Sequence, residues 1–353
     1  MKKLPQHQSG VAVVTALLLT TLAITIVASL FWQQQVQVRS IENQRLQLQK
    51  KWVLRGALDW ARLILREDGR GRKVDHLKEA WATPLAETRL DEYVENGRAD
   101  TEASDATLSG QITDAQSRFN INNLATNGIV NPKEVLAFER LLTNVKLDPS
   151  LAAATATAVA NSQTKKVSAN ASGPATVIGA VSGSNATDAS IPTVPNTTDA
   201  SKSTSNANQA STDTIPEVQF LRFTQIDDVL SVPGFTSDML LKLRDFVTVL
   251  PHATPINVNT ASAEVLSARI TALSLSDAAA IIASRDRAEF LDIADFKQRF
   301  PDKLTDISAN DVSVATDYFI AAGKIKLGRS TLNFSALIER IDIVTKIIWI
   351  REL

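Results

Sequence analysis

The chain of 353 residues contains no cysteine, which excludes disulfide frameworks, zinc ribbons and cysteine nucleophiles. Its three histidines, His7, His76 and His252, stand far apart in the sequence, which argues against a histidine-based metal site or catalytic triad. An excess of one charge is also lacking, because 37 basic residues face 38 acidic ones and leave a formal net charge of −1. Bulk electrostatic attraction to nucleic acid is therefore not expected.

The common sequence signatures of enzymes are missing as well. The chain has no glycine-rich phosphate loop, no Gly-x-Ser-x-Gly elbow and no cluster of metal-ligand residues. We therefore predict no catalytic, cofactor-binding or metal-binding residues and no enzymatic activity. With 44% hydrophobic and 21% charged residues, the composition is nevertheless that of a chain that folds around a core.

An uncharged apolar run follows a short basic N-terminus. Residues 1–10 are polar and include Lys2 and Lys3, whereas residues 11–31, VAVVTALLLTTLAITIVASLF, carry no charge. A helix of that length can cross a bilayer core of about 30 Å. The two lysines predict a cytoplasmic N-terminus, and Trp32 falls where aromatic rings favour the far interface. We predict one membrane crossing, with the bulk of the chain beyond it.

Three explanations fit this N-terminus. A cleaved secretory signal needs a shorter apolar core and a small-residue cleavage site, but here a glutamine-rich stretch follows directly. A plain signal anchor fits the length and the charge. In the third explanation, the short basic leader that ends in glycine and runs at once into an apolar helix resembles a prepilin leader. That resemblance implies that prepilin peptidase cuts between Gly10 and Val11 and methylates the new amine of Val11.

Thr15 occupies the fifth position after this predicted cleavage site, where pilins usually carry a glutamate. In pilins that glutamate is thought to pair with the N-terminal amine of a neighbouring subunit inside the membrane. A carboxylate buried there without such a partner is costly. The resemblance therefore implies a subunit that has no neighbour above it.

Beyond the apolar run the pattern remains helical. No proline or glycine interrupts residues 32–55, and apolar residues recur at steps of three and four from Val53 to Leu65. This spacing predicts an amphipathic helix with one buried face, which ends near the glycines of residues 68–71. A membrane anchor that leads into an ordinary core helix explains the pattern equally well.

Residues 107–121 mix β-branched and polar residues around a glycine, and they predict a strand or a hairpin. Residues 110–124, GQITDAQSRFNINNL, resemble a segment of the K-type minor pseudopilins of type II secretion systems, as does the EAWA of residues 79–82 upstream. For Asp114, Arg118 and the asparagines of this segment we expect turn chemistry and a local ion pair rather than catalysis.

A helix and a low-complexity stretch are predicted next. Residues 133–147 carry a broad apolar face that Asp148-Pro149 ends. Residues 152–214 are mainly Ala, Ser, Thr and Asn and bury too little surface to offset their chain entropy, so we predict a flexible linker. K-type pseudopilins often carry an acidic, calcium-associated stretch here, which this chain lacks. Calcium is thus possible by resemblance alone, with unknown ligands.

Two helical hairpins are predicted between residues 216 and 310. Residues 230–235 resemble half of a helix-hairpin-helix, and residues 255–266, PINVNTASAEVL, resemble both K-type pseudopilins and the DNA-receptor modules of competence systems. Thr260 or Ser262 is the expected N-cap of the helix that follows. A DNA-binding hairpin needs a Gly-h-Gly turn and nearby cations, but acidic residues outnumber basic ones here. We therefore favour protein–protein packing over nucleic acid.

The C-terminal residues return to strand patterns. Strands are predicted at residues 312–322, 332–340 and 343–351, with turns at Gly323 and Gly328. An antiparallel meander fits these segments.

The resemblance covers nearly the whole chain except the low-complexity stretch. It implies a pilin-like α+β fold, in which a long N-terminal helix packs on an antiparallel sheet and a large helix-hairpin-helix or SAM-like insertion separates the strands. The boundaries expected on this basis are a leader at 1–10, a transmembrane helix at 11–31, a periplasmic helix and first sheet segment at 32–125, the start of the insertion at 126–151, the linker at 152–214, the main helical insertion at 215–310 and C-terminal strands at 311–353.

The resemblance also implies a function. It is that of a minor pseudopilin in the bacterial inner membrane, with most of the chain in the periplasm. Such a subunit joins I-type and J-type minor pseudopilins at the tip of the pseudopilus and initiates or caps assembly for protein export across the outer membrane. Prepilin peptidase and the inner-membrane assembly platform are its further expected partners. A minor pilin or DNA receptor of a competence or type IV pilus system is the alternative.

Overall fold

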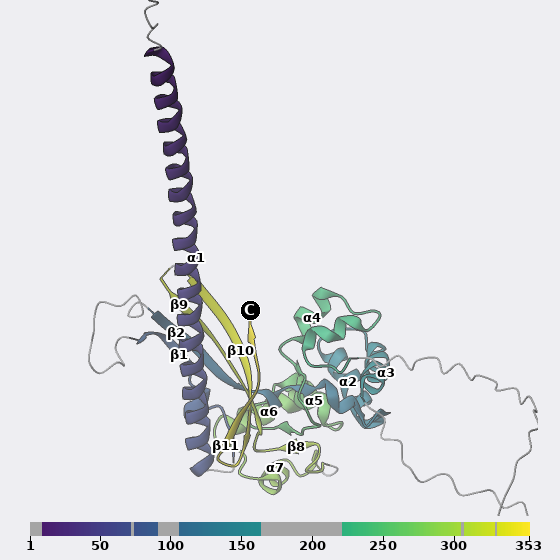
Figure 1. The fold of residues 1–353 in the computed structure, drawn as a ribbon. Coiled ribbons are helices and arrows are strands. Elements are labelled where there is room, and N and C mark those ends of the chain that lie inside the picture. Colours follow the sequence, from purple (N-terminus) through teal and green to yellow (C-terminus); the bar gives the residue numbers. More distant parts are fainter. Residues whose placement is uncertain (1–8, 72–73, 91–105, 164–220, 305–306, 329) are drawn as a thin grey trace, which may run out of the picture.

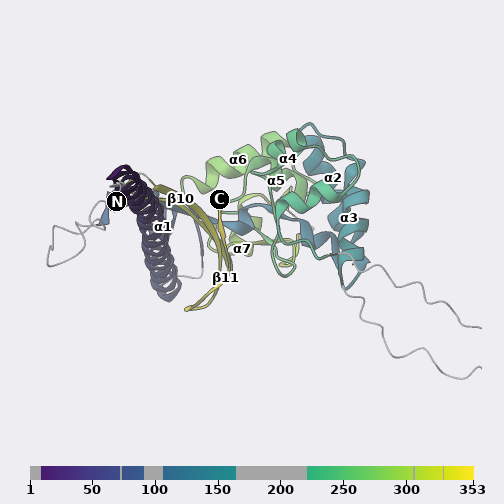
Figure 2. The same cartoon turned by 45° about the horizontal axis from the view of Figure 1, so that its top comes forward.

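The computed structural model describes residues 9–71, 74–90, 106–163, 221–304, 307–328 and 330–353. Helix α1, Ser9–Gly71, is the longest element, and its N-terminal half projects away from the rest of the fold (Figure 1). Its C-terminal half packs on one face of a sheet, and a helical domain lies on the other side of that sheet (Figure 2). The α+β fold expected from the sequence is confirmed.

Among the described residues, the sheet has five antiparallel strands in the order β1-β2-β9-β10-β11. These strands are β1 Leu85–Arg89, β2 Ala106–Asp114, β9 Tyr318–Leu327, β10 Ser330–Ile341 and β11 Val344–Glu352. Strands β2 and β9 pair at the centre of the sheet, with Asp114 opposite Phe319. The helical domain therefore leaves and rejoins the sheet at neighbouring points, although residues 115–317 separate them in sequence.

One face of α1 holds the helix on the sheet. Leu54, Leu58, Ala61 and Leu65 follow one another at helical spacing, and all four are buried. Burial of one leucine side chain contributes about 1.5–3 kcal/mol, so this face fixes the C-terminal half of the helix firmly. The helix ends at Gly71, as the sequence predicts.

Gly323 does not mark a turn, contrary to the prediction. It lies inside β9, opposite Gly110 of β2, and the ring of Phe334 covers it. A β-carbon at Gly323 would stand 2.7 Å from the Cζ atom of Phe334, so only glycine lets this ring lie against the strand. The predicted turn at Gly328 is present, with φ of 56°.

In the described residues, the helical domain contains six α-helices. They are α2 Pro132–Asn144, α3 Leu151–Ser162, α4 Ser237–Leu243, α5 Ala263–Arg269, α6 Leu275–Arg285 and α7 Ile293–Arg299. Side-chain caps begin most of them: Asn131 accepts from the amide of Lys133, and Ser262 accepts from that of Val265. Ser262 is thus the N-cap of α5, one of the two residues that the sequence offered.

Short 3-10 turns and strand pairs are further elements of the described residues; of these, η1 packs against α1 and β2 and not in the helical domain. The turns are η1 Ala80–Ala82, η4 Ala115–Ser117, η5 Ile121–Leu124 and η6 Ile226–Ser231. The strands are β3 Phe119–Asn120 with β6 Val247–Thr248, β4 Ala125–Thr126 with β5 Ile129–Val130, and β7 Ile256–Asn257 with β8 Val312–Ser313.

The structure moves three predicted boundaries. Residues 115–125, expected in the first sheet segment or a hairpin, form two 3-10 turns and the short strand β3 outside the five-stranded sheet, and Phe119, Ile121 and Leu124 pack in the core of the helical domain. Residues 152–162, expected in the linker, form most of α3, because their alanines and Val159 fill that core despite the simple composition. Residues 312–313 pair with β7 instead of continuing into β9, since the chain between them bends back to the domain. The rest of the predicted linker, residues 164–214, lies outside the described residues.

Candidate functional site

The N-terminal half of α1 is a candidate membrane anchor. From Val11 to Phe31 its side chains are exposed, and it is the one helix among the described residues that is long and apolar enough to cross a bilayer. The Thr15 hydroxyl donates to the carbonyl oxygens of Val11 and Ala12, each at 3.0 Å, so its polar group is satisfied within the helix. Gly10 and Val11 lie in the first turns of this helix, both exposed.

A buried polar cluster joins the sheet to the helical domain, and we call it the junction cluster. Its members are Asp68, Asp75, Asp114, Asn257, Thr260, Thr316 and Arg340. Arg340 of β10 forms ion pairs with Asp75 and, at 2.8 Å, with Asp68 at the end of α1. Its guanidinium also lies over the ring of Phe319, 4.6 Å from the centroid. One cation therefore ties α1, the following loop and the sheet together.

Asp75 and Asp114 extend this cluster into the helical domain. The amide of Thr316 donates to Asp75 at 2.7 Å, where the chain returns from the domain to the sheet. Asn257 donates from Nδ2 to Asp114 at 2.9 Å and to the backbone oxygen of Asp75 at 3.1 Å. The hydroxyl of Thr260 donates to Asp114 at 2.5 Å. Each of these directed bonds limits rotation of the domain against the sheet.

Burial controls the electrostatics of the junction. It raises the pKa of Asp114 to about 6, against the hydrogen bonds that Thr260 and other donors make to the carboxylate. Burial likewise raises the pKa of Asp75, although Arg340 opposes the shift, and it raises the pKa of Glu79 and of Asp317. The folded chain therefore holds protons at the junction that an unfolded chain releases at lower pH.

This proton binding predicts a pH dependence of stability. An acid with a raised folded-state pKa binds more protons when folded, so its contribution to the unfolding free energy falls as pH rises through the window from about 4 to about 6. For Asp114 the shift corresponds to about 3 kcal/mol at neutral pH. We expect the full chain in detergent to melt at a higher temperature near pH 5.5 than near pH 7.5, and Asp114→Asn to reduce this difference. Replacing the exposed control residue, Asp302→Asn, should leave the difference in melting temperature between the two pH values unchanged. If Asp114→Asn shows the same difference as the wild type, the assignment to Asp114 is contradicted.

Asp68, Asp75 and Glu79 are the one group of three carboxylates that comes together within the described ranges, with oxygens inside 4.8 Å. Arg340 already pairs with Asp68 and Asp75, and Glu79 accepts from the indole Nε1 of Trp81 at 2.7 Å. A guanidinium thus occupies the place where a cation would bind, and the trio does not fit calcium. This trio therefore does not supply the calcium site that the resemblance left possible.

The motif at residues 110–124 serves the same junction. Asp114 accepts from the amide of Gln116 and caps η4, as turn chemistry predicts. Asn120, Asn122 and Asn123 reach further than expected: their side chains donate to backbone oxygens of residues 250–254 at 2.7 to 2.8 Å. The expected local ion pair is not formed between Asp114 and Arg118, because Asp114 turns toward Asn257 and Thr260.

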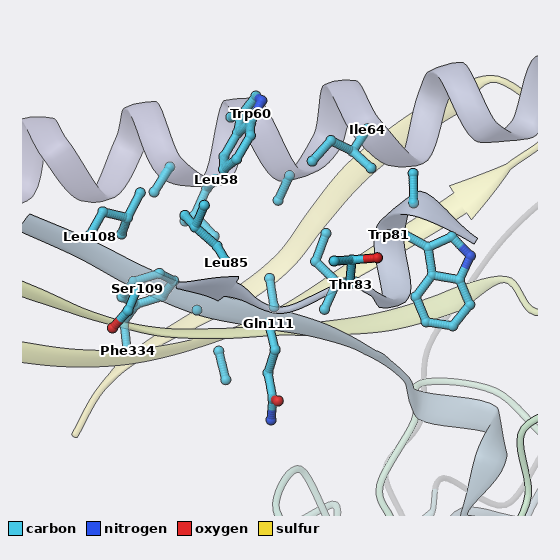
Figure 3. A pocket seen from close by; sticks show the side chains of 17 residues that line it. Leu58, Trp60, Ile64, Trp81, Thr83, Leu85, Leu108, Ser109, Gln111 and Phe334 are labelled. Carbon is cyan, nitrogen blue, oxygen red and sulfur yellow. The ribbon is translucent and has the colours of Figure 1, made fainter. Parts of the chain in front are cut away.

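Two grooves run along α1, one beside strand β1 and one beside strand β11. The α1–β1 groove is apolar and is lined by Val53, Gly56, Ala57, Trp60, Leu85, Thr88, Leu90 and Leu108. A pocket continues from it under the helix toward Ile64 and Trp81 (Figure 3). The α1–β11 groove mixes apolar and charged side chains and is lined by Leu48, Lys51, Trp52, Leu54, Arg55, Leu58, Asp59, Arg62, Ile347 and Ile350. Both grooves are candidate contact surfaces for other chains.

Comparison with known proteins places the chain in a family. Residues 117–176 and 256–315 match models described as type II secretion system (T2SS), protein K. Type II secretion system protein K of Pseudomonas aeruginosa is 27% identical over 328 residues, which cover 91% of this chain and 85% of that protein. This chain is a member of the protein K family.

A solved structure shares the fold of this protein K. A chain in the crystal structure of the GspK-GspI-GspJ complex from the type 2 secretion system of enterotoxigenic Escherichia coli superimposes with a TM-score of 0.57. The match covers 89% of this chain and 99% of that chain at 17% sequence identity. Together with the family matches and the curated relative, this supports a minor pseudopilin of type II secretion.

The family matches cover much of the helical domain, not the membrane helix. The stretch 256–315 begins at β7 and includes Asn257 and Thr260 of the junction cluster. The predicted sites Gly10, Val11 and Thr15 lie outside both stretches.

Sequence reasoning missed Arg340 and Asp75, since a charged residue in a strand or a loop gives no signal of a partner that lies far away in the chain.

Proposed function

We propose that this protein K caps the tip of the pseudopilus. The support is the position of the helical domain, which projects from the sheet on the side away from α1 (Figure 2). In a helical filament every subunit has the same neighbours, so a domain of this bulk repeated at each step would collide with the next subunit. A single copy at the end meets no subunit above it.

The threonine at the fifth mature position, Thr15, supports a place at the tip of the pseudopilus. A glutamate at the fifth mature position would need the amine of a subunit above as its partner, and the tip offers none. The threonine needs no partner chain, because the carbonyl oxygens of Val11 and Ala12 accept its hydroxyl.

We further propose how the chain reaches this place. Prepilin peptidase cuts between Gly10 and Val11 and methylates Val11, and α1 crosses the inner membrane once, with the bulk of the chain in the periplasm. The solved relative is in a complex with GspI and GspJ, and by analogy this chain assembles with I-type and J-type minor pseudopilins. Together they start or cap the pseudopilus on the inner-membrane assembly platform.

Co-expression of the full chain with the I-type and J-type minor pseudopilins of its own secretion system tests this proposal. We expect all three to co-purify from detergent-solubilised membranes with one copy of each. A control in which residues 10–51 are replaced by an unrelated single-pass helix should lose both partners. Recovery of protein K alone, or as a polymer of itself, would contradict the proposal.

A further inference from the structure

A stripe of exposed side chains runs along α1 into the α1–β11 groove. Ile41, Arg45, Leu48, Trp52 and Arg55 follow one another at steps of three or four and therefore share one face of the helix. Leu48 is 60% and Trp52 68% exposed. Large apolar side chains left this open, in a row on one helix, indicate a surface that another chain covers.

Strand β11 supplies the second wall of this groove. Ile350 is 47% exposed and lines the groove together with Ile347. Arg62 holds the wall to the helix, because its guanidinium donates to the backbone oxygen of Thr345 at 3.0 Å. The groove is therefore held in place between α1 on one side and strand β11 on the other.

The charge of the groove is one-sided. Lys51, Arg55 and Arg62 line it against the single acid Asp59, which already pairs with Arg62 at 3.1 Å. Within the described ranges Arg45, Lys51 and Arg55 form no ion pair; Arg55 lies 5.8 Å from the ring centroid of Trp52. Among the described residues, the side chains that line the α1–β1 groove are all uncharged. The two flanks of α1 thus differ in the partner that they fit.

The direction of the stripe identifies the form of that partner. Helix α1 continues without interruption from the groove into its apolar anchor (Figure 1). A neighbour anchored in the same membrane must cross it as a helix and leaves the bilayer beside α1. A helix that packs along this stripe buries the apolar side chains and brings its flanking residues against Arg45 and Arg55.

We propose that the α1–β11 groove binds the periplasmic part of the N-terminal helix of one neighbouring minor pseudopilin, which presents an apolar ridge flanked by acidic residues. This inference rests on the proposed function, and it adds which flank of α1 is used and which charges the neighbour must carry. The described lining of the α1–β1 groove is uncharged and gives such a helix no cation to pair with.

The test uses the full chain, co-expressed with the I-type and J-type minor pseudopilins of the same secretion system. Arg45→Glu combined with Arg55→Glu should reduce co-purification of one of the two by at least tenfold. The matched control combines Lys242→Glu with Arg287→Glu, two exposed residues of the helical domain, and should retain it within twofold. Arginine in place of the acids on the neighbour's helix should restore binding to the double variant.

A photo-crosslinking residue gives a second measurement. Placed at Leu48, it should form an adduct with that same neighbour, mapped by mass spectrometry to its N-terminal helix. If the wild-type complex forms but the Arg45/Arg55 variant binds equally well, or if Leu48 yields no adduct with either neighbour, the groove assignment is overturned and the proposed function stands. If the wild-type chain recovers neither neighbour, the proposed function fails and this inference with it.

Discussion

Replacing Arg340 with methionine is expected to lower the free energy of unfolding by about 3–5 kcal/mol. Arg340 is buried, and its removal leaves Asp75 and Asp68 without their cation. Asp75 is itself buried, so its carboxylate must then either stay charged in a poor environment or take up a proton. Methionine preserves much of the side-chain volume, so the loss reports the charge rather than a cavity.

Chemical denaturation of the full chain in detergent measures this effect. Lys326→Met, at an exposed position of β9 in the same sheet, should stay within about 0.5 kcal/mol of the wild type. The loss in Arg340→Met should shrink as pH is lowered toward 5, because protonation of Asp75 removes the unpaired charge. A loss below about 1 kcal/mol at neutral pH would show that the junction cluster does not hold the domains together.

Replacing Gly10 with phenylalanine is expected to leave an uncut precursor and to abolish secretion. The proposed cleavage follows Gly10, and a bulky side chain there should prevent the peptidase from accepting the bond. The fold itself should not suffer, since a β-carbon at Gly10 meets no atom within 4 Å. Any defect would therefore arise from processing.

Intact mass and N-terminal sequencing of membrane-purified chains measure this outcome. The wild type should begin at methylated Val11, whereas Gly10→Phe should begin at Met1. Gly56→Phe is a matched control in the same helix, also without neighbouring atoms within 4 Å, and should be processed normally. Normal cleavage of Gly10→Phe would contradict the prepilin assignment.

Much of the fold could be predicted from local patterns. The spacing of Leu54, Leu58 and Leu65 determines which face of α1 is buried. Strand-type residues predict β10 and β11, and Gly328 marks the turn before β10. Such patterns depend only on near neighbours in the chain. They suffice for helices and strands that bury one face against whatever lies beside them.

The rest depends on contacts that sequence periodicity does not reveal. Composition alone assigned residues 152–162 to the linker, but small side chains such as Ala152 and Ala156 let α3 pack closely in the core. Gly323 resembled a turn residue until the ring of Phe334 was found against it. The junction cluster unites Asp75, Asn257 and Arg340 from distant parts of the chain, so no local signal could connect them.

The place of the chain in the filament is tested most directly by labelling. Pseudopili assembled with this protein K carrying an epitope in the helical domain should bind one gold particle at one end only, with none along the shaft. Filaments assembled without the chain should bind none. Gold distributed along the length would show that the helical domain is accommodated at every step, and it would contradict a capping role.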